Sequence, residues 1–278
     1  MRNNTKRLGI SGQKEQGESA VKSSADFSFV LSTEFVDLPT KGRFYSEGHP
    51  LHNCEKVEIK HMTAKEEDML VNNSFSQEFN PLGSIFSSVI LNKEIDPLSM
   101  LISDRNAVLY TLRKISYGND YEVKPTCAEC KKTFHQIFNL EDCIKISEGN
   151  ISPDFAKTEY GTLIFKTEKT KADVEFRLLN GYDESYLLKL QKEFLAENKA
   201  INYNEFILNS SIVAVNDSEE LVPQYIDEAP ISEVHQLREA ILEITPTVKI
   251  IGVKDCIHCG HTEEAEIPIG LSFFRFNS

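Results

Sequence analysis

Two short cysteine pairs carry the clearest chemistry in this sequence. Cys127 and Cys130 form one C-x2-C unit, and Cys256 and Cys259 form a second unit far along the chain. A C-x2-C turn offers two thiolates, and a Zn2+ ion with a closed tetrahedral shell needs four ligands. The sequence therefore predicts one structural Zn2+ per chain, with four ligands: Cys127, Cys130, Cys256 and Cys259.

The elements around these pairs must bring distant parts of the chain together. A strand-like run follows each pair, over residues 133–138 and 262–267. The usual spacer between the halves of a zinc ribbon is about 15–20 residues, whereas residues 131–255 separate the two halves in this chain. We therefore expect a split zinc ribbon, closed by the middle and C-terminal segments around an inserted region.

Other chemistry is also compatible with cysteine pairs. Disulfides, free or redox-active thiols and a catalytic metal are the alternatives to a structural ion. Neither pair opens a helix in a thioredoxin-like βαβ pattern, which argues against a redox motif. His261-Thr-Glu263 and Pro125-Thr-Cys127 match parts of a zinc deaminase signature, but the order is reversed and a Thr follows the Pro. Four thiolates around one ion would leave no position for a reactive water.

Composition and charge narrow the class of protein. The chain of 278 residues is 40% hydrophobic and 26% charged, which are ordinary values for a soluble globular protein. Its formal net charge of -13 argues against a nucleic-acid partner, because phosphate contacts need a basic surface. No apolar run reaches the ~20 residues of a membrane helix, and the N-terminus lacks a signal-peptide core. We expect a soluble protein, with no membrane partner, in a reducing compartment that keeps thiolates free for metal.

The N-terminal half is expected to combine a tail, short strands and helices. Residues 1–26 are polar and lack apolar periodicity, so we expect them to be disordered. A turn separates two short extended pieces over residues 27–45, and residues 57–62 alternate like a half-buried strand. Thr63 and Glu66 form a capping box that starts a helix. Further helices are predicted over residues 81–91, 97–102 and 104–116.

The second half is expected to hold a β-hairpin and helices between the two cysteine pairs. Residues 162–166 and 174–178 are strand-like on either side of a polar link, which predicts an antiparallel pair. Residues 223–230 are interpreted as irregular. Helices are predicted over residues 183–198, 204–215 and 232–243.

Together these elements predict an α+β fold. We expect a mainly helical body with short antiparallel strands and the split four-cysteine zinc ribbon. It begins with a disordered tail (residues 1–26) and an N-terminal strand-turn and helical region (27–118). The first half of the ribbon (119–143) is followed by an inserted β-hairpin and helical region (144–246). The second half of the ribbon, with an aromatic C-terminus, ends the chain (247–278).

Motifs of common enzyme classes are missing from the sequence. It contains no G-x-x-x-x-G-K-[ST], G-x-G-x-x-G, G-x-S-x-G or H-E-x-x-H. The seven histidines are scattered, and none stands beside a nucleophile in a recognisable motif. Acidic clusters such as residues 66–68 are usually solvated surface, because buried acids are rare. We therefore expect that the protein is not an enzyme and has no catalytic residues.

Four strings carry a resemblance to a known family. Three lie in the N-terminal half: residues 38–51, which begin Leu-Pro-Thr-Lys-Gly-Arg-Phe-Tyr, residues 57–70, and residues 104–109 with Tyr117-Gly118. The fourth is Cys256-x-x-Cys-Gly-His with the later run Ile-Pro-Ile-Gly-Leu-Ser-Phe-Phe, which looks like the zinc-bearing members. On these strings the sequence resembles the baseplate hub subunit and hub assembly family of T-even-like contractile-tailed bacteriophages.

The resemblance implies a late viral protein that builds the baseplate hub through protein contacts, with the two cysteine pairs as ligands of a structural zinc. Its expected partners are baseplate hub and tape-measure proteins, met in the host cytoplasm during assembly and, for a permanent component, in the virion tail. One alternative is an assembly chaperone for the tape-measure protein that is absent from the mature virion. Another is a zinc-ribbon nucleic-acid-binding accessory protein. Residues 38–45 and the helix from Thr63 are expected to form the contact surface or its support, and the oligomeric state stays open.

Overall fold

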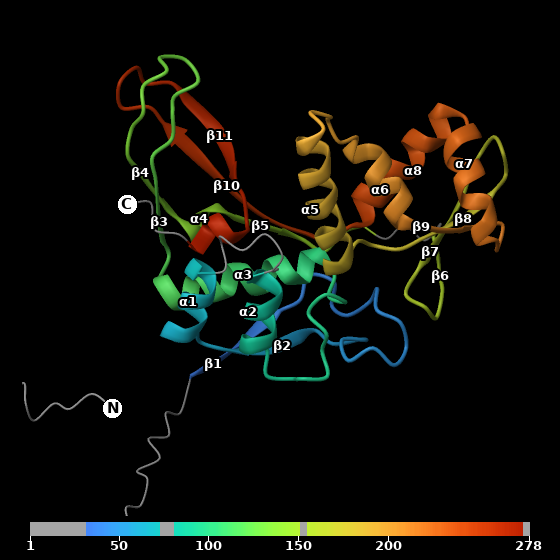
Figure 1. Ribbon diagram of the computed structural model, residues 1–278, viewed down its shortest axis with the longest axis horizontal. Coiled ribbons are helices and arrows are strands. Elements are labelled where there is room, and N and C mark those ends of the chain that lie inside the picture. Colours follow the sequence, from blue (N-terminus) through green and yellow to red (C-terminus); the bar gives the residue numbers. More distant parts are fainter. Residues whose placement is uncertain (1–31, 73–80, 151–154, 275–278) are drawn as a thin grey trace, which may run out of the picture. The chain divides into compact units, whose positions relative to one another are not determined.

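The computed structural model describes residues 32–72, 81–150 and 155–274. The chain divides into two units, Met1–Leu31 and Ser32–Ser278, and every described residue belongs to the second. The predicted tail over residues 1–26 and the extended piece that follows it lie outside the described residues. Within the described residues, helices alternate with strands that form four antiparallel sheets (Figure 1). The α+β class is therefore confirmed, the expectation of a mainly helical body is not, and the bounds of the predicted segments stay a prediction.

A two-stranded sheet and three helices form the N-terminal part of the described chain. Strand β1 (Thr33–Asp37) pairs with β2 (Lys56–Lys60), and Val36, Val57 and Ile59 of this pair are buried. Three helices follow: α1 (Ala64–Asn72), α2 (Pro81–Val89) and α3 (Ile102–Tyr117). The predicted helix over residues 97–102 is wrong, because this segment forms turns and α3 begins only at its end.

Helix α3 lies in the middle of the core. Val108 and Leu112 are fully buried, and even Arg105 is only 2% exposed. The helix ends where the sequence predicts, because Gly118 adopts φ +82° and donates its N–H to the carbonyl of Lys114. A left-handed residue of this kind is readily supplied by glycine.

The strands around the cysteine pairs belong to two sheets. β3 (Asp120–Val123) pairs with β4 (Gln136–Asn139), and a short α4 (Leu140–Cys143) leads from β4 into β5 (Ile144–Ser147). In the second sheet β10 (Thr247–Asp255) lies between β5 and β11 (Thr262–Ile267). The inserted region therefore leaves from β5 and returns through β10, its antiparallel neighbour.

The inserted region has its own four-stranded sheet and helices. The strands, in the order β6-β7-β8-β9, are β6 (Ala156–Lys157), β7 (Leu163–Lys166), β8 (Asp173–Phe176) and β9 (Ile212–Val215). The predicted β-hairpin is confirmed as β7 and β8. The helices, with one 3-10 turn, are α5 (Gly181–Ala196), α6 (Tyr203–Ser211), η3 (Glu219–Leu221), α7 (Val222–Glu228) and α8 (Ile231–Ile244).

Two predictions in the inserted region are wrong. The helix predicted over residues 204–215 ends at Ser211, because Ile212–Val215 pairs with β8 as a strand. The segment interpreted as irregular, residues 223–230, is largely helical. Pro223 lies in the first turn of α7, where a missing N–H costs nothing, and so begins the helix.

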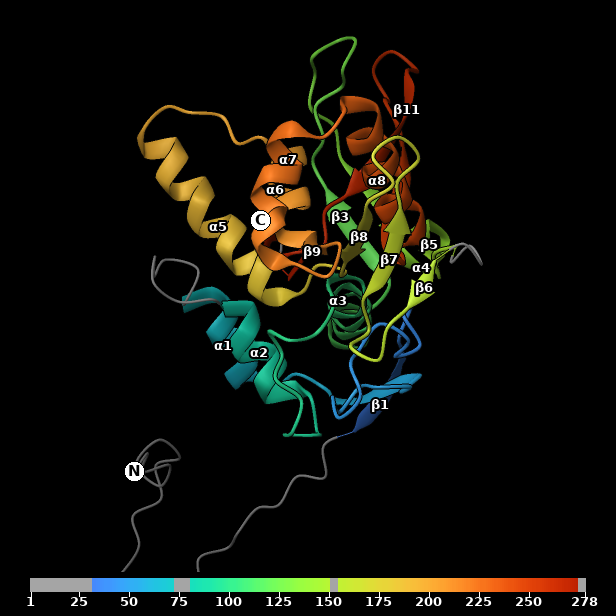
Figure 2. The same cartoon turned by 90° about the vertical axis from the view of Figure 1, so that its right-hand side faces the viewer.

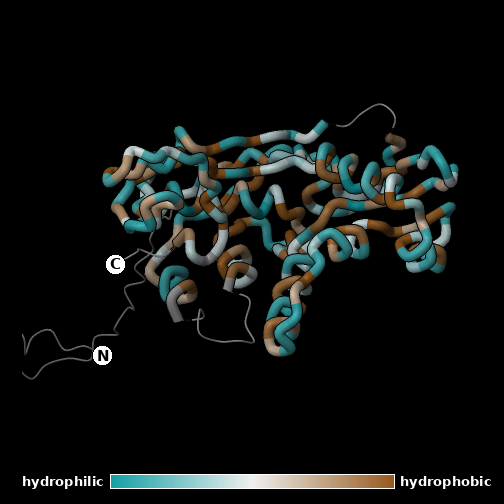
Figure 3. Tube along the Cα trace, turned by 90° about the horizontal axis from the view of Figure 1, so that it is seen from above, coloured by the Kyte–Doolittle hydropathy of each residue, from teal (hydrophilic) through white to brown (hydrophobic). Residues whose placement is uncertain are grey.

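One connected hydrophobic core runs from β1 to the C-terminal 3-10 helix η4 (Leu271–Phe274). Phe273 and Phe274 are buried, and the Phe273 ring lies 5.2 Å from that of Tyr121, so this part of the aromatic C-terminus folds back on the core. Hydrophobic and hydrophilic residues are interspersed along the described chain (Figure 3), as expected when each element has one buried face. None of the helices in the described parts of the chain has the length and apolarity needed to cross a bilayer.

Candidate metal centre

The two cysteine turns have the same backbone hydrogen bonds. In the first turn the N–H of Cys127 donates to the carbonyl of Lys132 (3.0 Å), and the N–H of Lys131 donates back to the carbonyl of Cys127 (3.1 Å). The second turn, which begins at Cys256, repeats both bonds at equivalent positions, with distances of 2.9 and 2.8 Å. Each turn thus closes tightly and directs its two side chains to the same side.

The fourth residue after the first cysteine is left-handed in both turns. It is Lys131 in the first turn (φ +58°) and Gly260 in the second (φ +72°). Glycine adopts this conformation freely, whereas a residue with a Cβ atom pays roughly 1–2 kcal/mol. The first turn therefore holds a strained residue at a position where the second turn has none.

The structure brings all four predicted ligands together. Two sulfur pairs that link the turns, Cys127 with Cys259 and Cys130 with Cys256, are each 3.7 Å apart. Zn–S bonds of about 2.3 Å in a tetrahedron place sulfurs about 3.8 Å apart, so the spacing fits one ion. All four sulfurs lie within 4.8 Å of one another, and no disulfide joins them: Cys127, Cys130, Cys256 and Cys259.

Backbone N–H groups favour thiolates in this cluster, and contacts between the sulfurs lower the pKa of some cysteines and raise that of others. The N–H of Cys130 is the largest cause of the lowered pKa of the Cys127 thiol. Burial opposes ionisation of Cys256, but N–H groups of its own turn, together with the sulfurs of Cys259 and Cys127, outweigh it and lower its pKa to about 7. At Cys259 a backbone N–H favours the thiolate, but burial and the neighbouring sulfurs raise the pKa to about 12. A bound cation would favour the thiolate form of all four cysteines at once, so the donor set fits a metal ion.

The donor set is closed. Among the described residues, the four sulfurs are the one cluster of His, Cys, Asp and Glu ligand atoms that could hold an ion. His258, between the two cysteines of the second pair, and His261, two residues after it, do not join this cluster. A four-sulfur tetrahedral site is typical of Zn2+ or iron, and it leaves no open position for a reactive water. The arrangement can therefore hold a structural ion rather than a catalytic one.

Protein contacts also join the two halves of the ribbon. The side chain of Gln136 on β4 donates to the carbonyl of Val253 on β10 (2.7 Å) and accepts from the N–H of Asp255 (3.3 Å). Phe134 is buried against the cysteine sulfurs. Figures 1 and 2 show the two hairpins side by side up to the cysteine turns.

A glycine allows the hairpins to approach closely below the sulfurs. A Cβ atom on Gly252 of β10 would lie 2.6 Å from Cε1 of Phe138 on β4. The ring therefore packs directly on the backbone of β10. Sequence analysis missed Gln136, Phe138 and Gly252 as members of the site, although an isolated glycine within a strand pattern is a known sign of close approach.

The N-terminal strings that carry the resemblance form buried polar networks. Asp104 is fully buried, and its carboxylate accepts hydrogen bonds from the hydroxyl groups of Thr40 and Tyr45, both at 2.7 Å. Burial raises the pKa of Asp104 despite these donors. Since Leu38 is buried as well, this part of the first string is support for the fold rather than contact surface.

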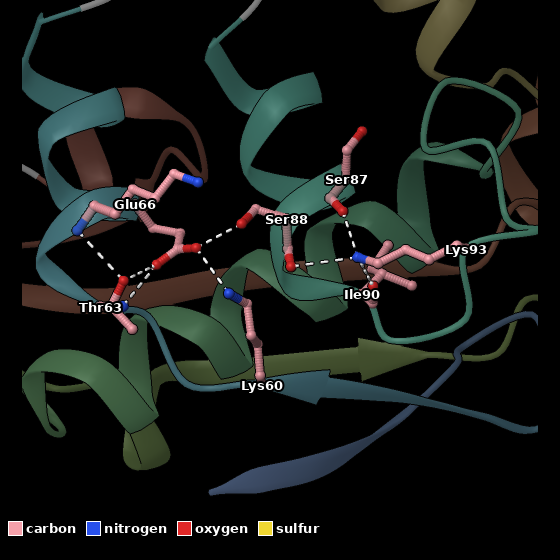
Figure 4. A network of polar contacts seen from close by, with 8 residues as sticks. Lys60, Thr63, Glu66, Ser87, Ser88, Ile90 and Lys93 are labelled. Carbon is pink, nitrogen blue, oxygen red and sulfur yellow. Dashed lines mark hydrogen bonds and ion pairs between the residues drawn. The ribbon is translucent and has the colours of Figure 1, made fainter. Parts of the chain in front are cut away.

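A second network surrounds Glu66 in α1 (Figure 4). Its side chain is 1% exposed, and it accepts from Lys60 Nζ and from the Thr63 N–H, both at 2.9 Å. The hydroxyl groups of Thr63 and Ser88 also donate to it. Burial opposes ionisation, but these donors outweigh it and hold the pKa of Glu66 far below its usual range. The predicted helix start is confirmed: Glu66 accepts from the Thr63 N–H, and the Thr63 hydroxyl accepts from the N–H of Lys65 (3.3 Å). After the end of α2, Lys93 Nζ donates to the carbonyls of Ser87 and Ile90.

Comparison with known proteins identifies one family. The family described as T4 bacteriophage base plate protein matches residues 32–275, which is most of the chain. No curated protein and no solved structure matches the chain. The matched range contains both cysteine pairs and all of the strings named above.

Proposed function

The chain belongs to the T4 bacteriophage base plate protein family, and we propose that it acts in the central hub of the baseplate, as a hub component or as a factor that assembles the hub. It works through protein contacts and catalyses no reaction. Its partners are other baseplate proteins, with hub and tape-measure proteins as the specific candidates. The observation that carries this proposal is the family match over residues 32–275.

In this proposal a single Zn2+ serves as a structural clasp. Its ligands come from the turn after β3 and from the turn between β10 and β11, so the ion ties together the two ends of the inserted region. Zinc supplies a crosslink of this kind without redox chemistry. The spacing of 3.7 Å between sulfurs of different turns supports it.

The charge around the cysteine cluster argues against the alternative of a nucleic-acid-binding protein. Strand β11, which follows the second cysteine turn, carries three carboxylates, Glu263, Glu264 and Glu266, and Lys254 beside it is ion-paired with Glu263. The first cysteine turn adds two exposed lysines, Lys131 and Lys132, and one exposed carboxylate, Glu129, so the described residues around the cluster form no basic surface. Phosphate binding requires the opposite sign of charge. The contact-based proposal fits this surface better.

Deletion of the gene from the phage tests the proposal. We expect infected cells to accumulate tails without complete baseplates, and we expect a plasmid copy of the wild-type gene to restore infectious particles. Normal tails in the absence of the gene would refute the proposal. Mass spectrometry of purified virions then separates its two forms, because a hub component is present in the particle and an assembly chaperone is not.

A further inference from the structure

One edge of strand β1 is unpaired. Among the described residues β1 pairs with β2 alone, and the two form a separate two-stranded sheet. Four of its five residues are exposed, and Phe35 in the centre of the strand is 60% exposed. Exposed hydrophobic strand edges are usually covered or blunted in natural proteins, because they pair readily with other chains.

Hydrogen bonds at both ends of β1 show which backbone groups face this edge. The N–H of His61 donates to the carbonyl of Ser32 (3.0 Å), and the N–H of Leu38 donates to the carbonyl of Glu55 (2.8 Å). In an antiparallel pair such bonds alternate, so even-numbered residues of β1 bond to β2. The N–H and C=O groups of Phe35 and its odd-numbered neighbours therefore point to the free edge.

This edge borders an apolar groove of about 350 Å3. Residues 34–37 line it consecutively, which is the pattern of a strand edge rather than a face. Ile144 and Ile146 of β5 line it at alternate positions, so β5 presents a face, and Tyr110 of α3 lines it as well. Ile146 is 59% exposed.

The charged residues that line the groove differ in whether they have an ion-pair partner. Asp37 pairs with Lys56 at 3.0 Å, and Lys114 pairs with Glu141. Glu34 forms no ion pair within the described part of the chain, and its charge acts on Lys114 only as a minor cause of the raised pKa of that lysine, after Glu141. An occupant with a basic residue beside Glu34 is therefore favoured over an acidic one.

We propose that this groove binds an extended segment of another baseplate protein, which adds to β1 as a third strand. The segment exchanges backbone hydrogen bonds with Phe35, the mode known as β-augmentation. Apolar residues at alternate positions pack on Ile144, Ile146 and α3, and a Lys or Arg faces Glu34. This inference rests on the proposed function for the class of partner and deepens it by naming the surface and the chemistry of the segment.

Peptide binding to the full-length protein tests the inference. The probes are overlapping twelve-residue peptides that span the other baseplate proteins of the phage, labelled for fluorescence anisotropy. We expect at least one basic, alternating apolar peptide to bind and to slow hydrogen exchange of the Phe35 amide. Phe35→Pro removes the edge N–H and should weaken binding about tenfold relative to Phe35→Thr, which keeps it.

A second pair of variants does not depend on a proline. Ile146→Lys places a charge in the groove and should abolish binding. Ile137→Lys is the matched control, because Ile137 is a strand residue of equal exposure, at 58%, outside the groove. Equal effects of the two lysines, or no bound peptide at all, would overturn the inference.

The inference would also be contradicted if the free edge of β1 were covered by the same chain or by a second copy of it. Protection of the Phe35 amide in the free monomer would show that the same chain already covers β1. A dimer that Phe35→Pro dissociates, seen by analytical ultracentrifugation, would show that a second copy does. In the phage, normal assembly with Ile146→Lys would refute only the claim that the groove binds a partner. Normal assembly without the gene would refute the proposed function itself.

Discussion

Replacement of Glu66 by glutamine tests whether the strings that identify the family act as support for the fold. The carboxylate of Glu66 joins α1 to β2 and α2, since Lys60 and Ser88 both donate to it. Glutamine keeps the volume of the side chain but removes its charge and one acceptor oxygen. The amide NH2 would then face a group that can only donate, Lys60 Nζ or the Thr63 N–H, beside a hydroxyl group that can also accept.

The expected cost follows from the contacts that are lost. Hydrogen bonds to a charged group are worth about 1.5–3 kcal/mol each, and a buried donor without a partner adds to the cost. The remaining oxygen can still accept from the Thr63 N–H, and Lys60 is 19% exposed, so water compensates part of the loss. We expect Glu66→Gln to lower the free energy of unfolding by about 3 kcal/mol, or Tm by about 6 °C.

Urea and thermal unfolding at pH 7 measure this difference, with Asp68→Asn as the control in the same helix. Asp68 is exposed, so its variant should stay within about 0.5 kcal/mol of the wild type. The folded-state pKa of Glu66 is depressed, so its stabilisation is complete above the ordinary carboxyl pKa of about 4.3 and is lost as pH falls through the folded value. The gap between Glu66→Gln and wild type should therefore narrow at pH 3. A Glu66→Gln protein as stable as the control would refute the reasoning.

Other predictions concern the ribbon. Gly252→Ala should cost about 1–3 kcal/mol in urea unfolding, because the new methyl would meet the aromatic ring packed on β10; an unchanged midpoint would contradict that contact. Lys131→Gly should raise the free energy of unfolding and Gly260→Ala should lower it, each by about 1 kcal/mol, since both residues are left-handed; changes of the same sign in the two variants would contradict the equivalence of the turns. Cys256→Ser should lose the bound metal in elemental analysis and unfold at lower temperature, and Cys54→Ser should do neither.

The proximity of the cysteine pairs could be predicted because metal chemistry imposes a local pattern. A C-x2-C turn is recognisable within four residues, and four thiolates near one ion are required wherever the two turns stand in the chain. The structure confirms that the sulfurs meet across the inserted region. Capping at Thr63 was predictable for the same reason, since Glu66 lies only three residues away.

Features that depend on distant contacts could not be predicted. Ile212–Val215 forms a strand because β8 offers it an edge, and no local pattern reveals that partner. Gln136 joins the ribbon halves through bonds to a strand more than a hundred residues away. The groove beside β1 likewise depends on how α3 and β5 pack against that strand.

The most direct test of the account is X-ray absorption at the zinc edge on the purified full-length protein. We predict one zinc per chain with a first shell of four sulfurs at about 2.3 Å. A shell that contains nitrogen or oxygen, or a folded protein that carries no metal, would contradict the claim that a structural ion ties the two distant cysteine turns together.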